Sequence, residues 1–209
     1  GLEQGRTYVY RVKMRDSCGN TTRFSGSEEA LWTQTKAFRS ADETTIVVEA
    51  ENFTRAVEGT GEADGFSWKV ISKGEESAGN GMMKALPDRG VQVSKGYETD
   101  APRLDYLIDF PRKGRYTIWL RSHGPHPGSD SIFIGLDMKG NDRSTFHTGN
   151  GRMQWQRHRD WSFEVDTAGL HTLNVWMRED GTTLDRLIIT ADQSYSEPEN
   201  EGPPESRRK

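Results

Sequence analysis

Two runs of residues in the middle of the chain decide the fold. They read Leu104-Asp105-Tyr106-Leu107-Ile108-Asp109-Phe110 and Tyr116-Thr117-Ile118-Trp119-Leu120-Arg121. Apolar and polar side chains alternate in both runs, as they do along a β-strand with one buried face. Lys113-Gly114 lies between them and has the composition of a tight turn. The stretch therefore predicts two short strands joined by a turn.

The same alternation recurs along the chain, while helical periodicity is scarce. Further alternating runs occupy residues 7–12, 46–51, 131–136, 161–165, 171–176 and 184–189. Turn residues separate the runs, at Ala168-Gly169, Asp180-Gly181 and Lys139-Gly140-Asn141-Asp142. Short strands with turn signals between them are typical of an all-β sandwich or barrel.

Composition excludes several classes of protein. The 209 residues carry 28 Lys and Arg against 32 Asp and Glu, and a pI near 5.8 argues against general nucleic-acid binding. No apolar run approaches the ~18 residues that a membrane span needs. Cys18 is the only cysteine, so an internal disulfide and a cysteine-only metal site are excluded. The small net charge and 20 aromatic residues (6 Trp, 6 Tyr and 8 Phe) argue for a folded domain.

Three zones and a short connection are predicted. Residues 1–38 resemble the last two strands of a fibronectin type III domain, through Gly5-Arg6-Thr7-Tyr8-Val9-Tyr10-Arg11-Val12 followed by Asp16, Gly19-Asn20 and Ser25. Residues 39–45 are expected to link them to a main domain at 46–192. Residues 193–209 are rich in Pro, Glu and Ser and are expected to form a disordered linker. Because the chain opens with Gly1 rather than Met, we expect a piece of a larger, multi-modular protein.

Catalytic motifs are scarce. The sequence has no nucleophile elbow, phosphate loop, dinucleotide fingerprint or His-x-x-x-His zinc pattern. Glycosidases need two carboxyl groups about 5–10 Å apart, one of them with a raised pKa. The candidates are Glu179, Asp180 and Asp185 near one loop, and Asp105 and Asp109 on one strand. Adjacent acids beside a glycine are more often solvated turn residues, which favours a binding domain over an enzyme.

Residues 46–192 resemble carbohydrate-binding modules of families 6 and 35. Five segments in order carry the resemblance: Val48-Glu49-Ala50-Glu51-Asn52-Phe53, Leu104–Phe110, Gly114–Arg121, Ala168–Val175 and Thr183–Ile189. The resemblance implies a jelly-roll β-sandwich that binds polysaccharide without catalysis. It also implies a structural calcium ion, held by Glu49, Glu51 and Asp185. Calcium prefers several hard oxygen ligands, which carboxylates supply. The alternative is that acids alternating on an edge strand simply face water.

The resemblance also implies a sugar site on the loops at one end of the sandwich. The matching positions are Tyr97 and Trp155, whose rings would stack on a sugar, and Thr183, which would bind its hydroxyls. The families usually carry Asn where this chain has Thr183. The other tryptophans of the domain are expected in the core; they are Trp68, Trp119, Trp161 and Trp176.

A basic loop indicates the class of polysaccharide. Residues 152–159 form the most basic stretch of the domain and include Arg157, and Arg121, His123 and His126 are expected at the same rim. Guanidinium groups bind carboxylate or sulfate in a bidentate manner. We therefore predict an acidic polysaccharide, sulfated or containing uronate, with a neutral galactan or glucan as the rival. The alternative is that these bases pair with local acids, namely Asp142, Asp160 or Glu179.

Together these features predict a non-catalytic module that tethers a larger protein to a polysaccharide. The parent is expected to be a bacterial protein that is secreted or held at the cell surface, with covalently linked neighbouring modules. It would be a glycoside hydrolase or a polysaccharide lyase. Two alternatives remain open: a structural or adhesive module that binds protein or cell-surface partners, and a small glycan-active enzyme.

Overall fold

The computed structural model describes residues 7–10, 28–31, 36–72, 77–147, 151–157 and 162–208. The chain forms two compact units, Gly1–Thr35 and Lys36–Lys209. In the first unit, β1 (Thr7–Tyr10) pairs antiparallel with β2 (Glu28–Leu31). β1 lies within the run predicted at residues 7–12. The fibronectin type III resemblance of this unit stays a prediction.

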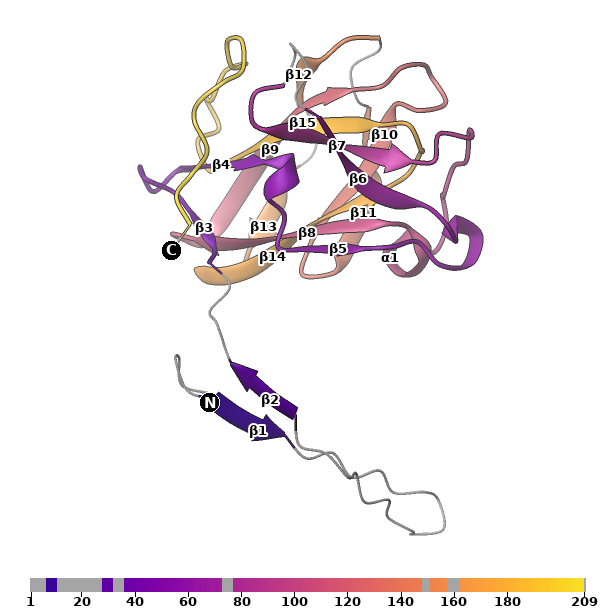
Figure 1. Ribbon diagram of the computed structural model, residues 1–209. Helices are drawn as coiled ribbons and strands as arrows, with labels where there is room; N and C mark the ends of the chain where they lie inside the picture. The colour runs from indigo at the N-terminus through magenta and orange to yellow at the C-terminus, as the bar shows by residue number, and fades with distance from the viewer. Residues whose placement is uncertain are drawn as a thin grey trace. The chain divides into compact units, whose positions relative to one another are not determined.

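The second unit is a jelly-roll β-sandwich, which confirms the predicted fold class (Figure 1). In its described residues, sheet one runs β11 (Lys139–His147), β10 (Ser131–Leu136), β14 (Gly169–Met177), β8 (Arg103–Phe110) and β3 (Phe38–Arg39), with β5 (Arg55–Val57) also against β8. Sheet two runs β12 (Gln154–Arg157), β9 (Gly114–His123), β15 (Thr183–Thr190), β7 (Gly81–Leu86) and β6 (Ser67–Ser72). In this second sheet β13 (Phe163–Val165) also pairs with β9, and β4 (Thr45–Glu49) with β15.

Helical structure is short. Two 3-10 helices, η1 (Ala50–Asn52) and η2 (Gly61–Ala63), and one α-helical turn, α1 (Tyr97–Asp100), lie in the connections. No helix in the described part of the chain has the length and apolar character to cross a membrane.

The core lies between the two sheets. On β8, alternate residues Leu104, Tyr106, Ile108 and Phe110 are at most 1% exposed, and they face the apolar residues of β9 and β15. The hydroxyl of Tyr106 donates to the Ala50 carbonyl at 2.8 Å, so its buried polar atom is satisfied. The alternation of residues 104–110 therefore marks the face of sheet one that is buried in the core.

One predicted turn lies elsewhere. The β10–β11 hairpin turns at Asp137 and Met138, whose φ angles are +50° and +64°, and not at residues 139–142. A two-residue turn with both φ angles positive follows the twist of antiparallel strands, although Asn-Gly or Asp-Gly is the usual sequence for it. Asp137 Oδ1 accepts from the Thr172 amide at 2.8 Å, and this bond holds the turn.

The predicted boundaries of the main domain are too narrow. Residues 39–45 are not a free linker, since β3 lies parallel to β8 and β4 begins at Thr45. Residues 193–208 are not a disordered linker either, because they pack along the outer face of sheet two. Figure 1 shows this yellow segment passing β4 and ending beside β3. We call residues 195–206 the C-terminal strap.

Main-chain and side-chain hydrogen bonds hold the strap in place. Arg186 on β15 donates to the carbonyls of Glu201 and Pro203 at 2.7 and 2.8 Å. Ser206 exchanges two bonds with Val47 on β4, both at 2.9 Å. Composition alone predicted disorder because it does not show that Arg186 and the edge of β4 form hydrogen bonds with the backbone of the strap.

Candidate functional site

A row of polar residues crosses the outer face of sheet two near one end of the sandwich. Lys69 on β6 is the register partner of Lys84 on β7, Lys84 pairs with Thr183 on β15, and Thr183 pairs with His123 on β9. Register partners project to the same face with Cβ atoms about 5 Å apart. We call these four residues the basic row. Three inter-strand spacings give it a length of about 14 Å.

The cations of the basic row are only weakly neutralised. The Lys84 ammonium lies 3.3 Å from Asp88, and the Lys69 ammonium 3.7 Å from Glu58. The Lys69 side chain is 56% exposed and that of Lys84 27% exposed. Surface ion pairs of this kind contribute about 0–1 kcal/mol, so an anionic ligand can displace them.

Two predicted sugar-binding residues therefore meet in the structure. Thr183 and His123 come from strands about 60 residues apart in sequence and are register partners in the basic row. Lys69 and Lys84 were not predicted. Their signal was the alternation of lysine with apolar residues in the β6–β7 hairpin, whose Trp68 and Ala85 face inward.

The predicted arginines are held by neighbours. Arg121 lies one pleat further along β9, with its side chain 10% exposed and its guanidinium 2.6 Å from the carboxylate of Asp185. Arg157 on β12 places its guanidinium over the ring of Trp119, 5.8 Å from the ring centre. This cation–π contact holds the Arg157 guanidinium against Trp119. Of the acids proposed as partners for the basic loop, Glu179 binds Arg178 instead, at 2.7 Å.

Tyr97 is not a sugar-stacking residue in this structure. It lies on α1, is 3% exposed, and stacks on Phe133 with ring centres 3.8 Å apart. Trp176 meets its edge at 5.5 Å. These three rings pack together on the outer face of sheet one, so the Tyr97 ring is buried there and has no free face.

Trp155 is also buried, contrary to the prediction. Its side chain is 8% exposed and packs with Val47, Trp119 and Ile188 in a second apolar cluster, on the outer face of sheet two. The indole Nε1 donates to the Asn200 carbonyl of the strap at 3.1 Å. The strap therefore occupies the position that a sugar ring would need. Trp68, Trp119 and Trp176 are core residues as predicted, and Trp161 lies outside the described residues.

The three predicted calcium ligands converge, although Glu51 does not lie on the same strand as Glu49. β4 ends at Glu49, and Glu51 lies in η1. A Cβ built on Gly79 would lie 2.6 Å from Glu51 Oε1 and 3.0 Å from Glu49 Oε2. Asp185 is the bulge residue of β15, and its Oδ1 accepts from the Ala78 amide at 3.0 Å. The loop at residues 77–81 therefore closes over all three carboxylates.

Glu49 and Glu51 each present a carboxylate oxygen that suits a cation, whereas Asp185 does not. Glu49 Oε2 and Glu51 Oε2 are buried and have no hydrogen-bond partner among the described residues. Burial raises the pKa of Glu49, and the charges of Glu51 and Asp185 raise it further, against a lowering by Arg186. Both oxygens of Asp185 are engaged, by Ala78 and by Arg121. Within the described residues no three acidic, His or Cys side chains form a complete metal site.

The carboxylates considered for glycosidase chemistry hold the loops together. Asp180 is fully buried and accepts hydrogen bonds from the amides of residues 89–91. Glu179 accepts from the Asp130 amide at 3.0 Å and from the Ser131 hydroxyl at 2.6 Å. Asp105 binds Arg103 and Asn174. Each carboxylate is hydrogen-bonded to neighbouring groups, so none of these three is available as a catalytic acid or base.

Comparison with known proteins identifies the second unit. Residues 40–205 match the sequence model of the glycosyl hydrolase family 115 C-terminal domain. The chain belongs to the glycosyl hydrolase family 115 C-terminal domain family. The match extends beyond the predicted limits of 46–192 at both ends and includes most of the strap, in agreement with the structure.

Individual relatives are distant from this glycosyl hydrolase family 115 C-terminal domain. "Uncharacterized protein P23" of Formosa agariphila is 28% identical over 120 residues, which cover 48% of this chain and 27% of that relative. The family 6 module of the laminarinase LamC from Zobellia galactanivorans is 16% identical, with a TM-score of 0.46 and coverage of 70% and 98%. A family 35 carbohydrate-binding module from Clostridium thermocellum is 13% identical, with a TM-score of 0.45, and the match covers 69% of this chain and 98% of that one.

Proposed function

We propose that the domain is a non-catalytic carbohydrate-binding module that holds a larger glycoside hydrolase against its polysaccharide. The observation that carries the proposal is the family match over residues 40–205, since that family is a C-terminal domain of glycosyl hydrolases. The commitment of Asp180, Glu179 and Asp105 to structural hydrogen bonds supports a binding role over a catalytic one. Tethering raises the local concentration of enzyme at an insoluble substrate. Such a parent would be secreted or held at the cell surface of a bacterium.

The basic row is the proposed polysaccharide contact. It is about 14 Å long and its Lys69 end is exposed, which suits several sugar units in a line better than one enclosed ring. Its two ammonium groups would bind sugar oxygens, while Thr183, which is 4% exposed, and the half-buried His123 form the end of the row at β15 and β9. Because Tyr97 and Trp155 are buried, stacking on those two rings plays no part.

An acidic polysaccharide, sulfated or containing uronate, is the proposed ligand class. Lys69 and Lys84 offer cations whose present partners are weak, and Arg89 and Arg152 are exposed on loops at the same end of the sandwich. Charge-assisted hydrogen bonds to carboxylate or sulfate are about twice as strong as neutral ones. A neutral galactan or glucan would use the hydroxyl-binding groups alone and would not respond to salt.

The test is an affinity-gel screen of the full chain against neutral, uronate-containing and sulfated polysaccharides. We expect retention by an acidic class, and we expect Lys84→Ala to weaken binding about tenfold or more, since hydrogen bonds to charged groups contribute about 1.5–3 kcal/mol. Lys113→Ala, in the exposed β8–β9 turn at the other end of the sandwich, is the matched control. Absence of binding to every class would refute the proposal and favour the adhesive alternative.

A calcium ion is proposed as a structural cofactor of the loop at residues 77–81. Glu49 and Glu51 would hold it, because their buried Oε2 atoms have no other partner among the described residues. A bound cation would neutralise two adjacent carboxylates and so tie η1 to the loop. Asp185 would position the loop through Ala78 rather than bind the ion.

A further inference from the structure

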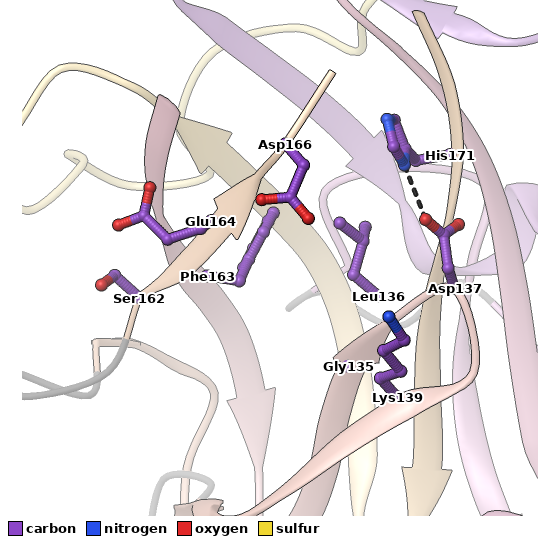
Figure 2. A pocket seen from close by; sticks show the side chains of 9 residues that line it. All are labelled: Gly135, Leu136, Asp137, Lys139, Ser162, Phe163, Glu164, Asp166 and His171. Carbon is purple, nitrogen blue, oxygen red and sulfur yellow. Dashed lines mark hydrogen bonds and ion pairs between the residues drawn. The ribbon is translucent and has the colours of Figure 1, made fainter. Parts of the chain in front are cut away.

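A cleft opens between the two sheets at the end of the sandwich away from the basic row. The basic row lies where β9 ends and β15 begins, whereas the cleft lies where β9 begins and β10 ends. Residues 135–139 of sheet one form one wall, with His171 beside Asp137, and residues 162–166 of sheet two form the other (Figure 2). Its volume is about 250 Å³. We call it the far-end cleft.

One wall of the far-end cleft is rigid. The two oxygens of Asp137 are engaged, one by the Thr172 amide at 2.8 Å and the other by His171 Nδ1 at 2.6 Å, the dashed contact in Figure 2. His171 Nε2 lies 2.8 Å from the Thr167 carbonyl. Both ring nitrogens face acceptors, so His171 is a bracing group and not a free base.

The remaining groups in the far-end cleft are available to a ligand. Asp166 and Lys139 are exposed, and neither side chain makes a hydrogen bond or ion pair with another described residue. They extend from opposite walls. The floor is apolar and is formed by the half-buried Leu136, beside Phe163, whose ring is 9% exposed and packs against Phe110 and Tyr116. Glu164 is occupied by Arg115 at 2.9 Å.

The two charged side chains and the apolar floor together match one class of ligand. An apolar floor suits the C–H face of a sugar ring, while a carboxylate and an ammonium group suit its hydroxyls, which both donate and accept. The free charges cancel, so a polyanion or polycation gains little here. The volume lies below the ~300–1,000 Å³ of drug-sized sites and leaves room for one ring.

We propose that the far-end cleft binds a single sugar unit through Asp166, Lys139 and the apolar side chain of Leu136. The ligand class rests on the proposed function, while the site is separate from the basic row. With contacts at both ends, one domain would bridge two glycan chains, or two segments of one chain, and gain avidity.

Amide NMR of the full chain tests the proposal. Methyl xyloside, methyl galactoside and glucuronate are added separately at constant pH up to about 50 mM, which covers millimolar Kd values. We expect saturable shifts of amides at residues 135–139 and 162–171 with at least one of these sugars. Asp166→Ala and Lys139→Ala should each weaken that response fivefold or more, while Lys113→Ala leaves it unchanged. Asp166 and Lys139 are exposed and take no part in packing, so both variants should fold.

Two results would overturn the far-end cleft as a sugar site. One is that none of the three sugars moves its amides. The other is that the shifts persist unchanged in the Asp166→Ala and Lys139→Ala variants, which would place the contact elsewhere. Amides of Lys84 and His123, followed in the same spectra with an acidic oligosaccharide, report the basic row separately. Failure at one end therefore leaves the other end tested on its own.

Discussion

Replacing Trp155 by alanine distinguishes most sharply between the structure and the sugar-stacking role that the family resemblance implied. In the structure the indole packs between sheet two and the strap. Its ring packs against Val47, Trp119 and Ile188, and its Nε1 binds the Asn200 carbonyl at 3.1 Å. Gly202 lies against its outer edge, since a Cβ there would come within 2.7 Å of Cζ2.

The structure sets the size of the effect. With 8% of its surface exposed, Trp155 is a core side chain, and a buried Trp→Ala change costs about 3–5 kcal/mol of unfolding free energy. In a domain of the size of Lys36–Lys209, each kcal/mol lowers Tm by about 2–4 °C. The expected loss for Trp155→Ala is therefore about 6–20 °C. A solvent-exposed ligand residue would change stability by about 0.5 kcal/mol or less.

Chemical and thermal denaturation of the full chain provide the measurement, with hydrogen exchange at residues 195–206 as the local readout. Trp155→Phe is the matched variant, because it keeps an aromatic ring and loses the Asn200 hydrogen bond; it should cost less than Trp155→Ala. Trp155→Ala should also speed exchange in the strap. Unchanged stability with abolished polysaccharide binding would show that the ring faces ligand, and our assignment of Trp155 to the core would be wrong.

Three further predictions concern other parts of the domain. Raising salt from 0.05 to about 1 M should weaken binding to an acidic polysaccharide by more than tenfold, and an unchanged Kd would favour a neutral ligand. Calcium at about 100 times its Kd should add about 2.7 kcal/mol of stability, measured by the rise in Tm over chelator, and Glu51→Gln should abolish the rise. Burial lowers the pKa of His171, but its bonds to Asp137 and the Thr167 carbonyl and the nearby acidic charges outweigh this and raise it above the usual 6.5. The stability from this contact is present below pH 6.5 and is lost as pH rises through the folded-state pKa; NMR titration should show Asp137→Asn lowering that pKa.

The fold could be read from local pattern because alternation reports burial directly. Every other side chain of residues 104–110 meets the core, so the period of two appears in the sequence whatever the strand pairs with. The strands with polar or mixed sequences, β11 and β12 among them, gave no such signal. β11 and β12 are formed by pairing with β10 and β9, respectively, and not by a pattern in their own residues.

The site was harder to predict because exposure depends on partners far away in the sequence. Trp155 lies between two glutamines in a polar stretch and looked exposed, yet residues 195–206 cover it. Thr183 and His123 were predicted separately, and only the β9–β15 register makes them neighbours. Lys84 joins them through the β7–β15 pairing and Lys69 through the β6–β7 pairing, neither of which the sequence revealed.

The sequence by itself therefore determined the all-β class, the principal strands and the buried tryptophans of β6, β9 and β14, since each follows from local alternation and residue chemistry. The tertiary structure alone decided which side chains reach solvent. It covered Tyr97, Trp155 and Thr183, engaged Asp185 with Arg121, and left Lys69 exposed. The physical reason is that burial and ion pairing are properties of pairs of surfaces, and a single strand does not specify what packs against its second face.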